Sequence, residues 1–348
     1  MPTLPPRALV RALLPYVSET LISPSVRSRL EAHTARLPAI FEWGIFECRF
    51  APAVDRVDML FRVSRPVAGA NGTQLPEEST WPADHGLEPI LPFFRTWLAA
   101  NNELADVPLF WVEHDLATSG ASPSPSPSPP FIQFCVDPGF PHASRALPIV
   151  PLRVRALAER GLAPLLGTAV DGAALDGLRR CAQRLPSKGR VLHVGVIPHR
   201  GSRDLRVLAA VPMESVLDWL AAIEWPGNRA LAAEIHGWLG THFEMASVQL
   251  DLGETVRPSL AMEFPLPSRD GNHPAWRAFM RILIDRGLAS AEKSRAALDW
   301  MGDATHDLPE TPWLVNLQRQ LDVKVSLSAD GELTAKAYLG FCPSFVLV

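Results

Sequence analysis

The amino-acid sequence predicts an α+β protein in which ten antiparallel strands close into a β-barrel inside an outer layer of helices. Three observations lead to this prediction. Alternating apolar and polar residues occur in five pairs of short runs, each pair forming a hairpin. A segment with helical periodicity separates each hairpin from the next. One face of the hairpins is apolar and the other is charged, which suits a closed sheet with helices outside and a polar cavity inside.

Five hairpins are predicted along the chain. Their strands are residues 41–50 with 56–63, 107–116 with 131–136, 190–200 with 204–211, 247–252 with 257–264, and the two halves of 322–341. The second hairpin contains the low-complexity run SPSPSPSPP, so residues 118–130 are expected to form an extended surface loop. The fifth hairpin turns at Asp330-Gly331, a dipeptide that accepts the positive φ of a tight turn.

Helical segments are expected between these hairpins. Residues 212–225 carry apolar side chains at helical spacing, and the helical pattern stops at Pro226-Gly227. In residues 273–287, Pro274 falls in the first turn and Gly287 at the C-terminal end, positions that these residue types favour. Further helices are expected over residues 6–37, 88–102, 149–184, 228–242, 289–301 and 311–320. We expect one domain over residues 1–348; the alternative is a two-domain α+β protein whose sheets stay open.

The polar face of the predicted strands is charged. In the last hairpin, Lys324, Lys336 and Tyr338 share this face. The same alternation selects Trp43, Glu47 and Arg49; Arg62; Trp111, Glu113 and Asp115; His193; Arg206; Gln249 and Asp251; and Glu263. Leu192 is expected on the opposite, helix-covered face. In a closed sheet the selected residues line a lumen, whereas in an open sheet they contact bulk water.

Composition and charge exclude several classes of protein. The 348 residues, 47% hydrophobic and 20% charged, are typical of a globular chain that can bury a large core. A formal net charge of −4 without a basic cluster argues against a nucleic-acid partner. The four cysteines match no zinc spacing, and His193 with His199 lacks a third ligand, so no metal site is expected.

The cellular location is predicted from what the sequence lacks. The N-terminal segment MPTLPPRALVRALLPYV is interrupted by prolines and arginines and has no signal-peptide pattern. No later apolar run is long enough to span a bilayer. We therefore expect a cytoplasmic protein with reduced thiols and no membrane partner.

The repeat architecture resembles the aromatic prenyltransferases with the ABBA fold, in which five αββα units close into a ten-stranded barrel around the reaction. Three short stretches add local similarity: FEWGIFECRF, VKVSL and AKAYLGF. The first resembles the first strand of indole and cyanobactin-peptide prenyltransferases, where an inward acid handles the acceptor. The other two resemble strand pieces that hold a diphosphate, although Ser326 stands where a tyrosine is expected. The sequence has no aspartate-rich DDxxD segment, the mark of another class of isoprenoid enzymes.

The resemblance implies transfer of an isoprenyl group from an allylic diphosphate, dimethylallyl or geranyl, to an aromatic indole-like acceptor or a peptide side chain. Glu47 would take the acceptor proton. The diphosphate would be held by Arg49, Arg62, Arg206, Lys324, Lys336 and Tyr338. The acceptor and prenyl pocket would be formed by Trp43, Trp111, Glu113, Asp115, His193, Gln249, Asp251 and Glu263, the aromatic rings facing the allylic cation. No cofactor is required, and Mg²⁺ could accompany the diphosphate.

Two alternatives remain open at this level. The inward acids outnumber what an indole acceptor needs, which suggests a cationic acceptor such as an arginine guanidinium, gripped by carboxylates; alternatively, these acids pair with the inward arginines. The second alternative concerns the activity itself. A barrel of the same fold could bind a small ligand or a precursor peptide of a biosynthetic pathway without catalysing a reaction.

Overall fold

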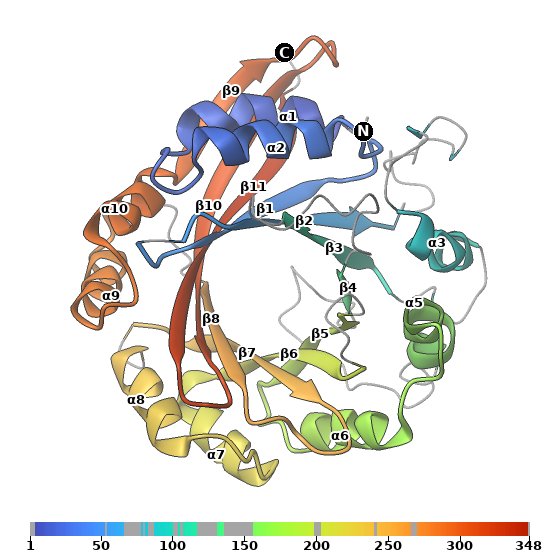
Figure 1. Ribbon diagram of the computed structural model, residues 1–348, viewed down its shortest axis with the longest axis vertical. Helices are drawn as coiled ribbons and strands as arrows, with labels where there is room; N and C mark the ends of the chain where they lie inside the picture. The colour runs from blue at the N-terminus through green and yellow to red at the C-terminus, as the bar shows by residue number, and fades with distance from the viewer. Residues whose placement is uncertain are drawn as a thin grey trace.

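Ten strands of the computed structural model close into a ring with helices on its outer side (Figure 1). The structure describes residues 4–52, 54–65, 78, 81–82, 87–99, 104, 107–116, 131–135, 156–197, 203–239, 242–265 and 270–346. The predicted loop over residues 118–130 and the side chain of His199 lie outside these ranges.

The strands follow one another around the barrel almost in sequence order. Their bounds are β1 Trp43–Arg49, β2 Val57–Ser64, β3 Leu109–Leu116, β4 Phe131–Cys135, β5 Arg190–Val196, β6 Leu205–Pro212, β7 Met245–Leu252, β8 Leu260–Pro265, β9 Gly302–Asp307, β10 Leu314–Leu327 and β11 Leu333–Val346. Each strand is antiparallel to its neighbours, and β11 closes the ring by pairing with both β10 and β1. The predicted ten-stranded antiparallel barrel built from five hairpins is therefore confirmed.

Helices cover the outside of this ring. Their bounds are α1 Pro6–Leu13, α2 Pro24–Thr34, α3 Leu91–Leu98, α5 Ala163–Leu166, α6 Gly172–Gln183, α7 Val216–Ala222, α8 Arg229–Leu239, α9 Pro274–Asp285 and α10 Ala291–Asp299. In Figure 1, α1 and α2 lie together across one side of the barrel, and α7 and α8 lie beside each other at another. Gly287 follows α9 with a φ of 69°, the left-handed conformation expected there. In the described part of the chain, no helix has the length and apolar character needed to cross a membrane.

The outer face of the barrel and the inner faces of the helices share one apolar core. Phe46, Cys48 and Phe61 point outward from β1 and β2 and are fully buried in it. Trp276 of α9 belongs to the same core. Because these strands bury their apolar side chains under helices, their alternate side chains are directed into the barrel.

The structure corrects two expectations about the C-terminal region. Residues 311–320 do not form the predicted helix, because β10 begins at Leu314 and continues to Leu327. Leu, Gln and Arg favour helices, but burial there alternates with a period of two, as Val315 and Leu317 are buried beside half-buried Asn316 and Gln318. An additional strand, β9, pairs with the first half of β10, outside the closed ring. Its sequence GDATHD has few strand-favouring residues, which explains why it was not predicted.

Candidate active site

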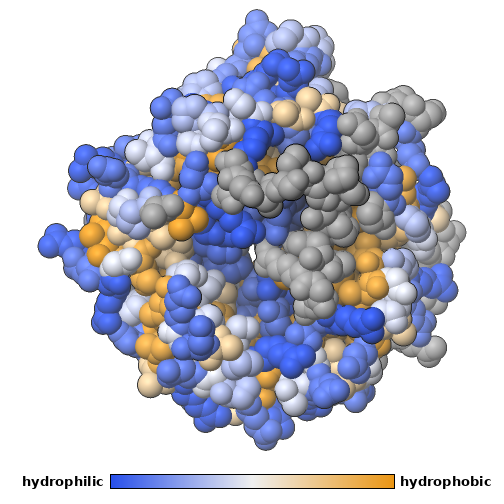
Figure 2. Space-filling view, in the orientation of Figure 1, coloured by the Kyte–Doolittle hydropathy of each residue, from blue (hydrophilic) through white to orange (hydrophobic). Residues whose placement is uncertain are grey.

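The barrel lumen contains a cavity of about 280 Å³. Of the residues predicted from the sequence, it is lined by Trp43, Glu47, Trp111, Glu113, His193, Arg206, Gln249, Glu263, Lys324, Lys336 and Tyr338. Figure 2 shows a hollow in the middle of this face, bordered to its left by hydrophilic residues. A second cavity of about 230 Å³ adjoins the first, sharing Arg206, Gln249, Lys324 and Lys336 with it. Side chains far apart in the sequence therefore meet around two adjoining cavities of the lumen.

Strand pairing arranges the lumen side chains of β1, β11 and β10 in two neighbouring rows. In the first row, Lys336 lies directly opposite both Arg49 and Lys324. In the second row, Tyr338 lies directly opposite both Glu47 and Asp322. Residues two apart on a strand point to the same side, so both rows face the lumen. A row of three cations thus lies beside a row in which two carboxylates flank a phenol; we call these the cation row (Arg49, Lys336, Lys324) and the carboxylate row (Glu47, Tyr338, Asp322).

Glu47 links the two rows. Its Oε1 accepts a hydrogen bond from Lys336 Nζ at 2.6 Å and another from the guanidinium of Arg49. Burial disfavours the charged carboxylate, but Lys336, Arg49 and Lys324 outweigh burial and hold the pKa of Glu47 well below its usual range. Burial conversely lowers the pKa of Lys336, an effect that Glu47 opposes. Glu47 is thus an ionised, ion-paired carboxylate.

Asp58 of β2, which was not among the predicted site residues, extends this ion pairing. Arg49 Nη2 lies 2.7 Å from Asp58 Oδ2, and Arg56 connects Asp58, at 3.2 Å, to Asp115, at 3.3 Å. Burial and the nearby Glu47 raise the pKa of Asp58, although Arg49 opposes the shift. Asp115 and Arg49 therefore belong to an ionic network along the wall, and neither lines the central cavity.

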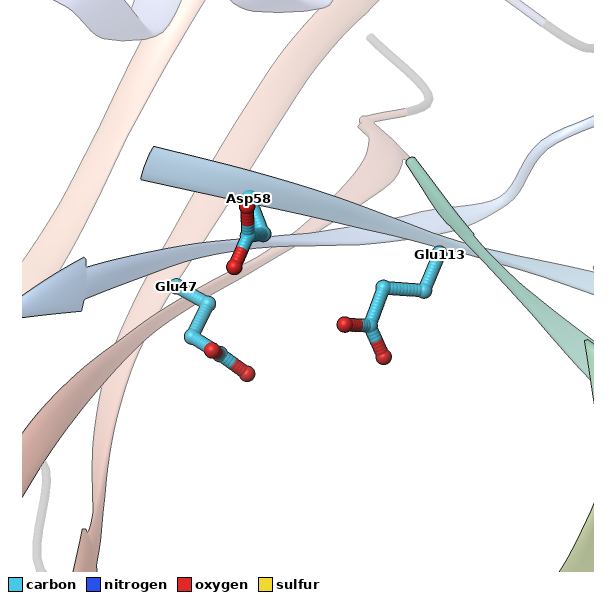
Figure 3. Close-up of side chains that lie close together, drawn as sticks. All are labelled: Glu47, Asp58 and Glu113. Atoms are coloured by element: carbon cyan, nitrogen blue, oxygen red, sulfur yellow. The ribbon is translucent and has the colours of Figure 1, made fainter. Parts of the chain in front are cut away.

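Three carboxylates converge where β1, β2 and β3 meet. Oxygen atoms of Glu47, Asp58 and Glu113 all lie within 4.8 Å of one another. Figure 3 shows Glu47 of β1 and Glu113 of β3 reaching into the same space, with Asp58 of the intervening strand β2 beside Glu47. The distance alone would suit a divalent cation. The charge of the cluster suits a divalent cation poorly. Arg49 already bridges Glu47 and Asp58, and Lys336 also neutralises Glu47.

Lys324 uses all of its donors inside the lumen. Its Nζ lies 2.6 Å from Gln249 Oε1, 3.1 Å from the Tyr338 hydroxyl and 3.1 Å from Glu263 Oε1. An ammonium group has three N–H bonds, so these three contacts account for its donors. Burial, reinforced by the neighbouring carboxylates Glu47, Glu263 and Glu113, raises the pKa of Tyr338 well above its usual value, so the phenol stays protonated.

Two further predicted cations occupy other parts of the wall. Arg206 forms a bidentate pair with Asp251, with distances of 2.8 and 2.9 Å, and its guanidinium lies 5.6 Å from the Phe131 ring centre. Arg62 lies opposite Trp43 and Trp111, and its guanidinium is 4.8 Å from the Trp43 ring centre. Arg62 is therefore placed with the aromatic residues and away from the cation row.

The lumen also has two apolar walls that the sequence analysis did not identify. One wall consists of Leu60, Leu109 and Trp111, with Trp43 and Ile45 packed against them. The other consists of Leu192, Leu208 and Ala210, with Met245 packed against them. The prediction that Leu192 faces the helices is wrong, because pairing between β5 and β6 shifts register between Val191 and His193. Leu192 and His193 consequently both line the cavity.

Among the described side chains of the predicted site, His193 is the one whose pKa is shifted by burial alone. Burial lowers the pKa of His193 to about 3. The imidazole is consequently neutral near pH 7 and can contribute a polar contact without charge.

Comparison with known proteins gives a match to the fold of this chain but none to a family model or a curated sequence. No known family model matches the chain, and no curated protein sequence matches it. Among solved structures, the crystal structure of AnaPT from Neosartorya fischeri matches with a TM-score of 0.52 and 12% sequence identity, over 96% of this chain and 90% of AnaPT. AnaPT is an aromatic prenyltransferase with the ABBA fold. The chain has the prenyltransferase-barrel fold. At this identity the match shows the fold, and the residues of the lumen must carry any argument about substrates.

Proposed function

We propose that this protein transfers an isoprenyl group from an allylic diphosphate to an acceptor held in the barrel lumen. The observation that carries the proposal is the cation row, in which Arg49, Lys336 and Lys324 meet at one level of a closed lumen. A diphosphate leaving group needs clustered positive charge, and a cavity closed by a barrel keeps water from the allylic cation. The shared fold with an aromatic prenyltransferase supports the same chemistry.

The second cavity is the proposed diphosphate site. It lies where β10 turns into β11, and its lining combines Arg206, Lys324 and Lys336 with the hydroxyl groups of Ser259, Ser326 and Thr334. Lysine and arginine donate charge-assisted hydrogen bonds to phosphate oxygens, and hydroxyl groups can add neutral ones. Each of these three cations already has a carboxylate partner. The diphosphate would therefore compete with Glu47 for Lys336, with Asp251 for Arg206 and with Glu263 for Lys324.

The isoprenyl chain would extend from this site into the larger cavity. The C1–O bond breaks, its electron pair remains on the diphosphate oxygen, and the acceptor nucleophile bonds to C1. The two apolar walls would contact the chain, and the rings of Trp43, Trp111 and Tyr338, which line the cavity, would stabilise the developing cation. Glu47 remains the proposed acceptor of the proton that the nucleophile releases, since its carboxylate is ionised at the cavity wall.

Magnesium is not needed at the protein side of this scheme. The carboxylates Glu47, Asp58 and Glu113 fit the ion poorly because arginine and lysine already neutralise two of them. Any Mg²⁺ would enter with the diphosphate, whose oxygens are its preferred ligands.

Calorimetric titration with the S-thiolodiphosphate analogues of dimethylallyl and geranyl diphosphate tests the proposal. We expect saturable binding that Lys336→Ala weakens by about tenfold, the typical effect of one charge-assisted contact. Lys188→Ala is the matched control, because Lys188 is exposed and lines neither cavity. Absence of heat with both analogues would refute the proposal.

A binding barrel without catalysis is the second candidate. It is favoured by the ion pairs of Lys336, Arg206 and Lys324 with Glu47, Asp251 and Glu263, which stabilise the lumen without any diphosphate. This candidate predicts no binding of either donor analogue and saturable binding of a small ligand or peptide. The same titration therefore separates the two candidates.

A further inference from the structure

Asp322 has a different environment from the other carboxylates of the lumen. It lines the larger cavity from β10, and it was not among the residues predicted from the sequence. Among the described residues, no hydrogen bond or ion pair joins its side chain to another group. Burial and the nearby Glu263 raise the pKa of Asp322 to about 7. A carboxylate in this position is thus poorly compensated within the protein alone.

The positions around Asp322 explain why. Across the sheet it lies opposite Tyr338 of β11 and Pro265 of β8, and neither carries a positive charge. Two residues away on the same strand, Lys324 spends its donors on Gln249, Tyr338 and Glu263.

The remaining nearby cation is also committed. On β11, Lys336 occupies a diagonal position relative to Asp322, and its ammonium lies 2.6 Å from Glu47. The charged and titratable groups that face Asp322 are therefore Lys324, Tyr338, Lys336 and Glu263, and the two lysines already contact other acids.

We propose that Asp322, together with Glu263, binds a positively charged nitrogen group of the acceptor and thereby selects cationic acceptors over neutral ones of the same shape. Glu263 lies opposite Lys324, hence diagonal to Asp322, and both acids line the same cavity. The inference rests on the proposed function, which it deepens by naming the acceptor class. Asp322 acts here as a specificity-determining residue, and the proposed transfer step itself is unchanged.

A guanidinium and an ammonium group share the chemistry that would satisfy this pair. A guanidinium can present two parallel N–H donors to one carboxylate, whereas an ammonium group is a compact charge that rotates freely. A positively charged acceptor would give Asp322 a partner of opposite charge and would reduce the repulsion between Asp322 and Glu263. A neutral acceptor would leave the two acids facing each other.

The test compares charged and neutral compounds of similar shape. Nα-acetyl-arginine amide is paired with Nα-acetyl-citrulline amide, and tryptamine with 3-propylindole, in which a methyl group replaces the ammonium. Binding to the full-length protein is measured by calorimetry at pH 8, with wild type, Asp322→Asn and the control Asp307→Asn, whose side chain is exposed on β9. We expect at least one charged compound to bind about tenfold more tightly than its neutral partner. Asp322→Asn should abolish this preference and Asp307→Asn should keep it.

Further readouts keep the inference testable and separate it from the proposed function. In the wild type, the preference for the charged compound should decline as the pH is lowered from 8 to 6, because Asp322 becomes protonated; this holds even if Asp322→Asn does not fold. Donor-analogue binding to the wild type is measured separately as the readout of the proposed function. If the donor analogue fails to bind at all, the proposed function fails, while the charged-over-neutral preference still decides the inference. Equal binding of charged and neutral partners, or a preference that survives Asp322→Asn, would overturn it.

Discussion

Lys324 and Lys336 lie directly opposite each other on β10 and β11, and each is held in the lumen by a different acid. Lys324 Nζ is 3.1 Å from Glu263 and Lys336 Nζ is 2.6 Å from Glu47. Like charges opposite each other on a sheet repel. The two carboxylates offset this repulsion at the place where the proposed diphosphate binds. The lumen is therefore preorganised for an anion while remaining stable without one.

The two lysines differ in how much they stabilise the fold. Lys324→Met leaves Gln249, Tyr338 and Glu263 without their common donor, so we expect a loss of about 3 kcal/mol in the free energy of unfolding. Lys336→Met leaves Glu47 paired with Arg49, so the loss should be about 1 kcal/mol. Urea unfolding of both variants measures the difference. Equal losses would show that the three contacts of Lys324 stabilise the fold no more than the contact of Lys336 with Glu47.

Glu47 should have opposite effects on donor binding and on turnover. Glu47→Gln removes the charge that competes with the diphosphate for Lys336, so the donor analogue should bind a few times more tightly. Loss of the proton acceptor should lower the rate of transfer by about 100-fold. Calorimetry and single-turnover assays measure the two effects, with Glu310→Gln, at an exposed position, as control. A variant that loses both binding and turnover would instead indicate a purely structural Glu47.

The fold was more predictable than the site, for physical reasons visible in individual residues. Alternation in β1 and β2 places Phe46 and Phe61 under the helices and Glu47 in the lumen, so strand faces followed directly from the sequence. Leu192 was assigned to the wrong face because a register shift in pairing leaves no mark in the alternation. Asp322 gave no distinctive sequence signal, since its isolation depends on which acids its neighbouring lysines contact across three other strands.

The apolar wall on β6 should set the length of the donor. Leu208 faces the cavity, so Leu208→Ala enlarges the space and should shift the preference from dimethylallyl towards geranyl analogues by several fold. Val207, the adjacent residue, points into the outer core. Val207→Ala should cost about 2 kcal/mol of stability without changing this preference. Competition between the two analogues measures the selectivity, and an unchanged ratio in Leu208→Ala would place the chain elsewhere.

Lys293 of α10 holds the end of β1 and the following loop. Its Nζ donates to the carbonyl oxygens of Arg49, Ala51 and Val54 at 2.9, 2.8 and 2.8 Å. Lys293→Met leaves three carbonyl groups without this donor, so we expect the free energy of unfolding to fall by about 3 kcal/mol. The exposed Lys188→Met is the control and should change stability by less than about 0.5 kcal/mol. Thermal or urea unfolding distinguishes this anchoring role from a surface lysine.

His33 of α2 and His114 of β3 should make stability depend on pH, because their rings are 4.5 Å apart between the helix and the barrel. Burial and Arg36 lower the pKa of His33 to about 4, and burial with His33 lowers the pKa of His114 well below its usual value. In the unfolded chain these histidines bind protons near pH 6.5, whereas in the folded chain they do so only at lower pH. Their contribution to the free energy of unfolding is therefore complete above pH 6.5 and is lost as the pH falls towards 4. For His33 alone the loss is at most about 3 kcal/mol. Urea unfolding between pH 8 and pH 4.5 measures this slope. His33→Phe should reduce the slope but not abolish it, because His193 and His114 continue to contribute. An identical slope in wild type and His33→Phe would show that His33 is protonated equally in the folded and unfolded states.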